Sequence, residues 1–219
     1  CTEPMTQPPR AIQANIIAVP TSTSTAYILL GPEKVALVNS GGNPSATEIK
    51  LALKQHKRSP ENVRAIFTTS PHHALNAGAP IFQNAITYTG IKDHRTLMSD
   101  KHPVALLPKL KARLSPRPPS AKSINNVYAG DHLQTQGFKI DVVGAPGVSR
   151  DSMMYIFDGV LFSGESLLIQ DGQLSIAPRH QVASRPQTIK SLSRLSYLQF
   201  NTIADAYGQV ASMGPKDVS

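Results

Sequence analysis

Two adjacent histidines, His72 and His73, are the side chains of this sequence most suited to chemistry. They follow an apolar segment, residues 63–68, that we expect to form a strand. An imidazole can bind zinc or transfer a proton near neutral pH. Neighbouring side chains on a strand or loop usually point apart, so we do not expect both histidines to face one site. The other five histidines lie among polar or basic residues or in a turn, without the spacing of metal ligands: His56, His94, His102, His132 and His180.

Other catalytic arrangements are poorly supported by the sequence. There is no Gly-x-Ser-x-Gly motif, no glycine-rich phosphate loop, and no cysteine beyond Cys1. Ser163 and Ser166 flank Gly164-Glu165, but the sequence shows no base positioned to activate a serine. Nucleophilic and phosphoryl-transfer chemistry are therefore not indicated.

Residues 66–79 resemble the strand-and-loop segment in which the metallo-β-lactamase superfamily carries Thr-His-x-His-x-Asp-His-x-Gly-Gly. Thr69, His72 and Gly78 match that segment. Three of its metal-ligand positions hold other residues: Ser70, Ala74 and Leu75. Further segments between residues 16 and 210 resemble segments of the family and follow one another in the same order. They are 38–41 with Asn39 at an aspartate, 128–133, 145–148 with Val148 at the third histidine, 161–165 with Glu165 at the bridging aspartate, 191–195, and 206–208 with Tyr207 at the final histidine.

The resemblance implies an α/β fold, a four-layer αββα sandwich like that of the metallo-β-lactamases. Enzymes of the family use bound zinc to generate a nucleophilic hydroxide. Of the seven metal-ligand positions, His72 alone is intact, and Glu165 keeps a carboxylate. Val148 and Leu75 would place hydrocarbon where an ion needs donors. We therefore expect no metal, no other cofactor and no catalytic residue.

The pattern of apolar residues predicts two similar halves, each with strands followed by a helix. In the first half we expect strands at 16–19, 27–30, 35–38 and 63–68, and a helix that begins at Asn43-Pro44 and ends near Gln55. In the second half we expect strands at 137–143, 153–157, 160–162 and a last one at 202–204, with a helix capped by Ser184 whose Ile189, Leu192 and Leu195 face inward.

The domain organisation follows from proline and charge. Residues 1–12 contain three prolines and few apolar residues, so we expect an extended tether outside the core. Residues 13–219 are expected to form a single domain. Within it, residues 92–122 hold eight basic and two acidic residues together with five prolines. We expect this segment to be an exposed basic excursion, either a solvated loop or a binding surface that includes Lys109, Lys111 and Arg113.

The sequence begins Cys1-Thr2-Glu3-Pro4, which resembles a bacterial lipoprotein after cleavage of its signal peptide. Cys1 would carry the lipid, and Thr2 in place of an aspartate favours the outer membrane. The alternative is an arbitrary starting point of the sequence. The 219 residues have a net charge of +8, which predicts attraction to an acidic protein or to anionic headgroups. Nucleic acid is not expected as a partner, because aromatic residues are few and no recognition motif is present.

Together these features predict a non-catalytic, lipid-anchored protein on the periplasmic side of the bacterial envelope, a binding or structural component of a larger assembly. Two alternatives remain open. One is a hydrolase with a rebuilt mononuclear metal site near His72 and Glu165. The other is a small-ligand or lipid binder that uses the vacated cleft.

Overall fold

The first sheet of the computed structural model has seven strands in the order of the sequence. The structure describes residues 7–98, 124–178 and 182–218. The seven strands are β1 (Arg10–Gln13), β2 (Ile16–Pro20), β3 (Thr25–Leu30), β4 (Val35–Val38), β5 (Val63–Phe67), β6 (Ile86–Gly90) and β7 (Ile124–Val127). β1 to β4 form an antiparallel meander, and β4 to β7 are parallel. Each parallel pair requires a crossover connection, which brings helices onto the sheet.

The second sheet has six strands in the order β15-β14-β11-β10-β9-β8. Its strands are β8 (His132–Thr135), β9 (Phe138–Gly144), β10 (Met153–Phe157), β11 (Val160–Gly164), β14 (Thr202–Asp205) and β15 (Val210–Ala211). β11 and β14 are parallel, and the other pairs are antiparallel. A separate hairpin joins β12 (Leu168–Gln170) to β13 (Gln173–Ser175).

The helices are short. The α-helices are α1 (Thr47–Gln55), α2 (His73–Asn76), α3 (Ile91–Met98) and α5 (Arg185–Leu192). The 3₁₀ turns are η1 (Pro60–Asn62), η2 (Ala79–Ile81), η5 (Ser193–Tyr197) and η6 (Pro215–Val218). In the part of the chain that the structure describes, no helix is both long enough and apolar enough to cross a membrane.

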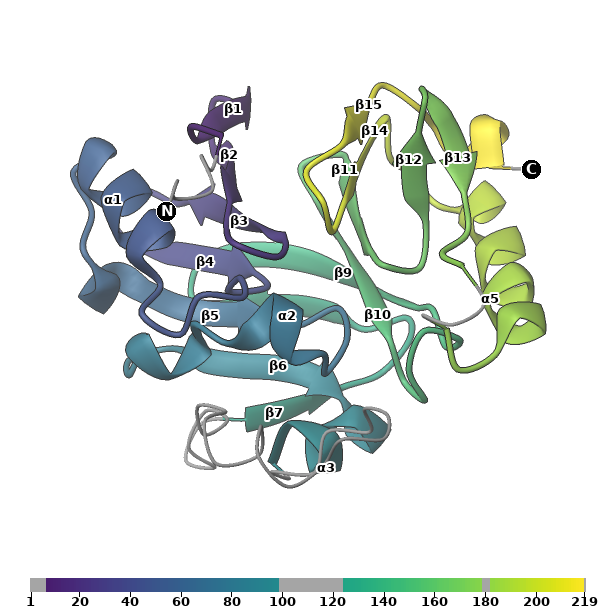
Figure 1. The fold of residues 1–219 in the computed structure, drawn as a ribbon, viewed down its shortest axis with the longest axis horizontal. Helices are drawn as coiled ribbons and strands as arrows, with labels where there is room; N and C mark the ends of the chain where they lie inside the picture. The colour runs from purple at the N-terminus through teal and green to yellow at the C-terminus, as the bar shows by residue number, and fades with distance from the viewer. Residues whose placement is uncertain (1–6, 99–123, 179–181, 219) are drawn as a thin grey trace, which may run out of the picture.

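The two sheets pack face to face, with helices on both outer sides (Figure 1). Successive side chains of a strand point to opposite faces, and β2 shows the consequence. Ile16 and Ala18 belong to the core between the sheets, whereas Ile17 and Val19 pack on the outer side with α1. Because both faces of the strand are covered, its sequence is a continuous apolar run rather than an alternating one.

Three apolar cores separate the four layers. The core between the sheets contains large aromatic side chains from both of them: Tyr27, Phe67, Tyr88, Phe138, Tyr155, Phe157 and Phe162. The second core joins the first sheet to Ile49, Ala52 and Leu53 of α1. The third joins the second sheet to Leu192 and Leu195. The predicted αββα sandwich is therefore confirmed.

Several predicted boundaries are wrong. The tether was expected to include residue 12, but β1 begins at Arg10 and pairs with β2. α1 begins at Thr47 rather than at Asn43-Pro44, because Asn43 Oδ1 accepts a hydrogen bond from the backbone N–H of Ser45 and Ala46 has a positive φ of 47°. The local turn made by Asn43 competes with helix formation there.

Three further differences concern the second half and the basic excursion. Ile189 of α5 is 52% exposed, whereas Leu192 and Leu195 are buried as predicted. The strand at residues 202–204 is not the last one, because β15 follows it. The excursion begins with a regular helix, α3, in which Asp93 is buried. Residues 99–123, which contain Lys109, Lys111 and Arg113, lie outside the described residues, as does Cys1.

Candidate functional site

The candidate site lies at the ends of strands from both sheets. β5 ends at Phe67 and leads into a loop that carries Ser70 and His72, and His72 directly precedes α2. β11 ends at Gly164 and is followed by Glu165. β14, which is parallel to β11, ends two residues before Tyr207. The carboxyl ends of parallel strands meet at one edge of a sheet, so this topology brings distant segments together.

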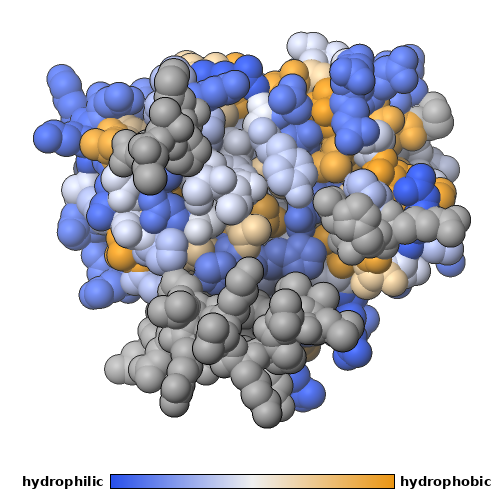
Figure 2. All heavy atoms as spheres, in the orientation of Figure 1, coloured by the Kyte–Doolittle hydropathy of each residue, from blue (hydrophilic) through white to orange (hydrophobic). Residues whose placement is uncertain are grey.

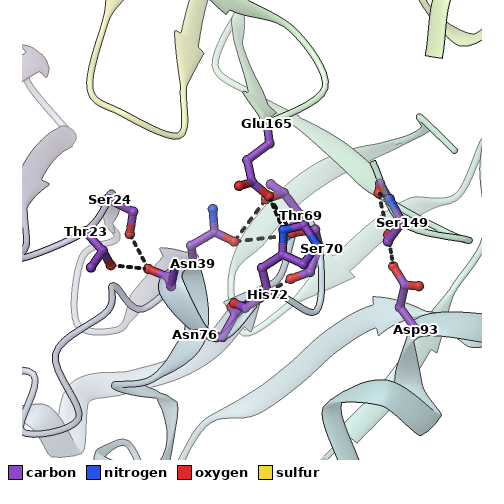
Figure 3. A network of polar contacts seen from close by, with 12 residues as sticks. Thr23, Ser24, Asn39, Thr69, Ser70, His72, Asn76, Asp93, Ser149 and Glu165 are labelled. Carbon is purple, nitrogen blue, oxygen red and sulfur yellow. Dashed lines mark hydrogen bonds and ion pairs between the residues drawn. The ribbon is translucent and has the colours of Figure 1, made fainter. Parts of the chain in front are cut away.

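Glu165 is the centre of a polar cluster, which we call the Glu165 cluster (Figure 3). Its Oε2 atom lies 2.6 Å from His72 Nδ1 and accepts a hydrogen bond of 3.1 Å from the hydroxyl of Ser70. Its Oε1 atom accepts a hydrogen bond of 3.3 Å from the hydroxyl of Tyr207. An ionised carboxylate only accepts hydrogen bonds, so Nδ1 of His72 carries the proton. Four of the eight predicted site residues are therefore brought together: Ser70, His72, Glu165 and Tyr207.

The electrostatics of the cluster follow from these contacts. The hydrogen bond to Glu165 raises the pKa of His72, burial opposes that rise, and the charges of Glu165 and Asp93 add to it. Burial raises the pKa of Tyr207 to about 12, and the nearby charge of Glu165 contributes. The cluster is partly open, because the His72 side chain is 36% exposed and Tyr207 is 44% exposed.

Asn39 does not line the cluster but supports the loop that carries Ser70 and His72. It has a positive φ of 57° and is 1% exposed, and its Oδ1 atom accepts hydrogen bonds from the backbone N–H and the hydroxyl of Thr69. Thr69 in turn contacts the other sheet, because a Cβ atom built on Gly164 would lie 2.5 Å from its hydroxyl oxygen. Gly164 has a φ of +59°, so both its conformation and the close approach of Thr69 favour glycine.

The other three predicted site residues contribute no polar side chain. Ala74 is exposed, and its carbonyl oxygen accepts hydrogen bonds from the hydroxyls of Thr23 and Ser24. Leu75 is completely buried, and Val148 is 3% exposed. Apolar burial at these two positions leaves no donor atoms for an ion.

A second polar group near His72 is missing from the sequence prediction. Asp93 of α3 is 2% exposed and accepts a short hydrogen bond from the hydroxyl of Ser149. The hydroxyl oxygens of Ser149 and Ser152 lie 2.5 Å apart. Burial raises the pKa of Asp93, and hydrogen bonds from Ser149 and at Asp151 offset only part of that rise. The signal in the sequence is slight: a single acidic residue among basic ones.

The residues present do not fit the zinc site of the catalytic family. A catalytic zinc needs three protein ligands and one open position for water. Within the described ranges, no three His, Cys, Asp or Glu side chains are grouped so that they could hold a metal ion. His72 and Glu165 are bonded to one another, and the remaining ligand positions are filled by a serine, an alanine, a leucine, a valine and a tyrosine.

Comparisons with known proteins support the fold. No family model matches the chain, and no curated protein matches it in sequence. Solved structures do match it, among them a metallo-β-lactamase family protein from Thermus thermophilus, with 19% identity and a TM-score of 0.74 over 95% of this chain and 78% of that one.

Two further solved structures are similar. The Rm3 metallo-β-lactamase has 15% identity and a TM-score of 0.74, over 97% of this chain and 89% of that one. MEM-A1, a subclass B3 metallo-β-lactamase isolated from a soil metagenome library, has 16% identity and a TM-score of 0.71, over 93% and 80%. At these identities the likeness concerns the fold. The chain has the metallo-β-lactamase fold, as its motifs predicted.

Proposed function

We propose that this chain is a non-catalytic, lipid-anchored protein of the bacterial envelope, a binding or structural component of a larger assembly. One observation carries the proposal: Glu165 binds His72 directly, so the two retained metal-binding groups satisfy one another. The buried side chains of Leu75 and Val148 support it, because they replace ligands with hydrocarbon. The chain has the fold of the family but lacks most of the side chains that would bind the zinc ions and so generate a hydroxide.

The anchor in this proposal is a lipid on Cys1, with the protein on the periplasmic side of the outer membrane. Acyl chains stabilise membrane attachment by about 0.8 kcal/mol for each buried methylene. Replacing Cys1 in the full precursor (Cys1→Ser) should release soluble protein into the periplasm. Fractionation is done in high salt, which removes purely electrostatic attachment, and unchanged membrane association under those conditions would contradict lipidation.

The partner in this proposal has an acidic surface and binds the basic segment at residues 92–122. Attraction between exposed charges is screened beyond about 8 Å at physiological salt, so rising salt should weaken co-purification of the partner. Replacing Lys109, Lys111 and Arg113 with glutamine should weaken it as well and leave the melting temperature nearly unchanged. A partner that stays bound despite both treatments would show that this segment is only a solvated loop.

The open side of the Glu165 cluster supports a second candidate, a small-ligand or lipid binder. His72 and Tyr207 are both partly exposed there and could donate or accept hydrogen bonds. A ligand that co-purifies with the wild-type chain and is lost on Tyr207→Phe would favour this candidate. Bound metal together with hydrolysis would favour the remaining alternative, a rebuilt mononuclear hydrolase.

A further inference from the structure

Helix α1 carries a basic outer face that is separate from the segment at residues 92–122. The helix and the turn that follows it, residues 47–58, contain four basic side chains and a single acidic one. Ile49, Ala52 and Leu53 turn inward and pack on the first sheet. Figure 1 shows α1 on the outer side of that sheet, and Figure 2 shows mainly hydrophilic residues over the same side of the molecule.

The lysines of this face are not neutralised within the fold. Among the described residues, no carboxylate lies within ion-pair distance of Lys50, Lys54 or Lys57. The one acidic residue of the helix, Glu48, accepts a hydrogen bond from Asn43 Nδ2. Arg58 has a structural role instead, because its guanidinium donates hydrogen bonds to the backbone carbonyl oxygens of Gly31 and Pro32. Three ammonium groups are therefore available to an external anion.

An aliphatic side chain lies beside these charges. Leu51 is 58% exposed, although it belongs to a helix that buries three other apolar residues. At 100° per residue, Leu51 and Lys54 lie on the outward side of the helix, and half-buried Lys50 and Glu48 lie on its two flanks. At an anionic membrane surface the ammonium groups of such lysines can contact the headgroups while the neighbouring aliphatic side chain enters the headgroup region.

We propose that the outer side of α1 and of the turn after it, formed by Lys50, Leu51 and Lys54 of the helix and Lys57 of the turn, docks on an anionic lipid surface. Charge complementarity favours anionic headgroups, and Leu51 favours a bilayer over a purely polar partner. The inference goes beyond the proposed function and does not depend on lipidation of Cys1. It would also fix which side of the sandwich faces the bilayer, because α5 covers the opposite outer face (Figure 1).

The test uses the full chain without lipid and measures its co-sedimentation with vesicles. Wild-type protein should bind vesicles of phosphatidylcholine and phosphatidylglycerol more tightly than vesicles of phosphatidylcholine alone, and high salt should abolish the difference. Each lysine near an anionic surface adds to the attraction, so the variant K50Q/K54Q/K57Q should bind at least roughly tenfold more weakly. Leu51→Ser should weaken binding by a smaller factor.

A matched control removes the same charge elsewhere. The variant K34Q/K139Q/K190Q replaces three lysines outside α1 and should bind nearly as well as the wild-type chain. Melting curves check that all variants are folded. Equal weakening of the two triple variants would overturn the proposal, because the effect would then come from net charge. Failure of the wild-type chain to bind anionic vesicles, or preferential binding to an acidic polypeptide such as polyglutamate, would overturn it too.

Discussion

The carboxylates of Glu165 and Asp93 both raise the pKa of His72, but their surroundings differ. Glu165 accepts hydrogen bonds from three side chains, carried by two separate segments (the loop after β5 and the residues after β14), at a partly open position. Asp93 is 2% exposed, and in the part of the chain that the structure describes a single side chain, that of Ser149, donates a hydrogen bond to it. Burial raises the pKa of Asp93, so its charged form is less favourable in the folded protein than in the unfolded chain.

The difference lies in the hydrogen bonds available to each carboxylate. Glu165 is satisfied by converging hydroxyl and imidazole donors. A buried carboxylate with fewer donors carries a desolvation cost instead. Removing the charge of Glu165 should therefore lower the stability of the fold, whereas removing the charge of Asp93 should not.

The largest loss of stability is expected from a substitution at Gly164, the last residue of β11, directly before Glu165. Gly164→Ala should destabilise the fold by roughly 3 kcal/mol, because φ is +59° and the new Cβ would lie 2.5 Å from the Thr69 hydroxyl oxygen. Gly172→Ala is the matched control, since φ is +74° there but nothing lies within 4 Å of the Cβ position. It should cost roughly 1 kcal/mol. Urea denaturation measures the free energy of unfolding of both variants. Equal losses would show that the Thr69 side chain moves aside without an energetic cost.

Removing one charge at a time compares the two carboxylates directly. Glu165→Gln should cost roughly 1–2 kcal/mol, because it removes charge-assisted hydrogen bonds with His72 and Ser70. Asp93→Asn should leave the free energy of unfolding within about 0.5 kcal/mol or raise it, because the amide oxygen can still accept from Ser149 without a buried charge. Denaturation at neutral pH gives both values. The reverse order of costs would contradict the comparison.

A smaller effect is expected from titrating His72. Its pKa is raised in the folded protein, so the protonated form stabilises the fold fully below the unfolded pKa of about 6.5. That contribution is lost as the pH rises through the folded pKa. Stability should therefore fall as the pH rises from about 6.5 through the raised pKa of His72, and His72→Gln should flatten this slope. His132→Gln changes an exposed histidine of β8 and should retain it. A slope that survives in His72→Gln would place the titration elsewhere.

The sequence was sufficient where local pattern and order decide the structure. The strands at residues 153–157 and 160–162 were predicted from two apolar runs, and β10 and β11 lie there as an antiparallel pair. The order of the motifs also predicted that His72 and Glu165 lie near one another, and in the structure His72 Nδ1 lies 2.6 Å from Glu165 Oε2.

The sequence was insufficient where tertiary packing decides. Asp93 is buried because the loop that carries Ser149 packs on α3, and nothing near Asp93 in the sequence indicates that contact. The start of α1 was misplaced because Asn43 forms its own turn. Ile189 was assigned to the core because its spacing suits the inward face of α5, but the helix lies so that this side chain is half exposed.

The central claim is that the fold has no resident metal, and zinc content tests it most directly. The full chain is purified without chelator, dialysed and subjected to elemental analysis, beside His72→Ala as the matched variant. We expect no stoichiometric zinc in either protein. We also expect no change in the melting temperature of the wild-type chain on addition of chelator, because no metal-binding energy is coupled to folding. Zinc near one equivalent that survives dialysis in the wild-type chain and is lost in His72→Ala would contradict the claim.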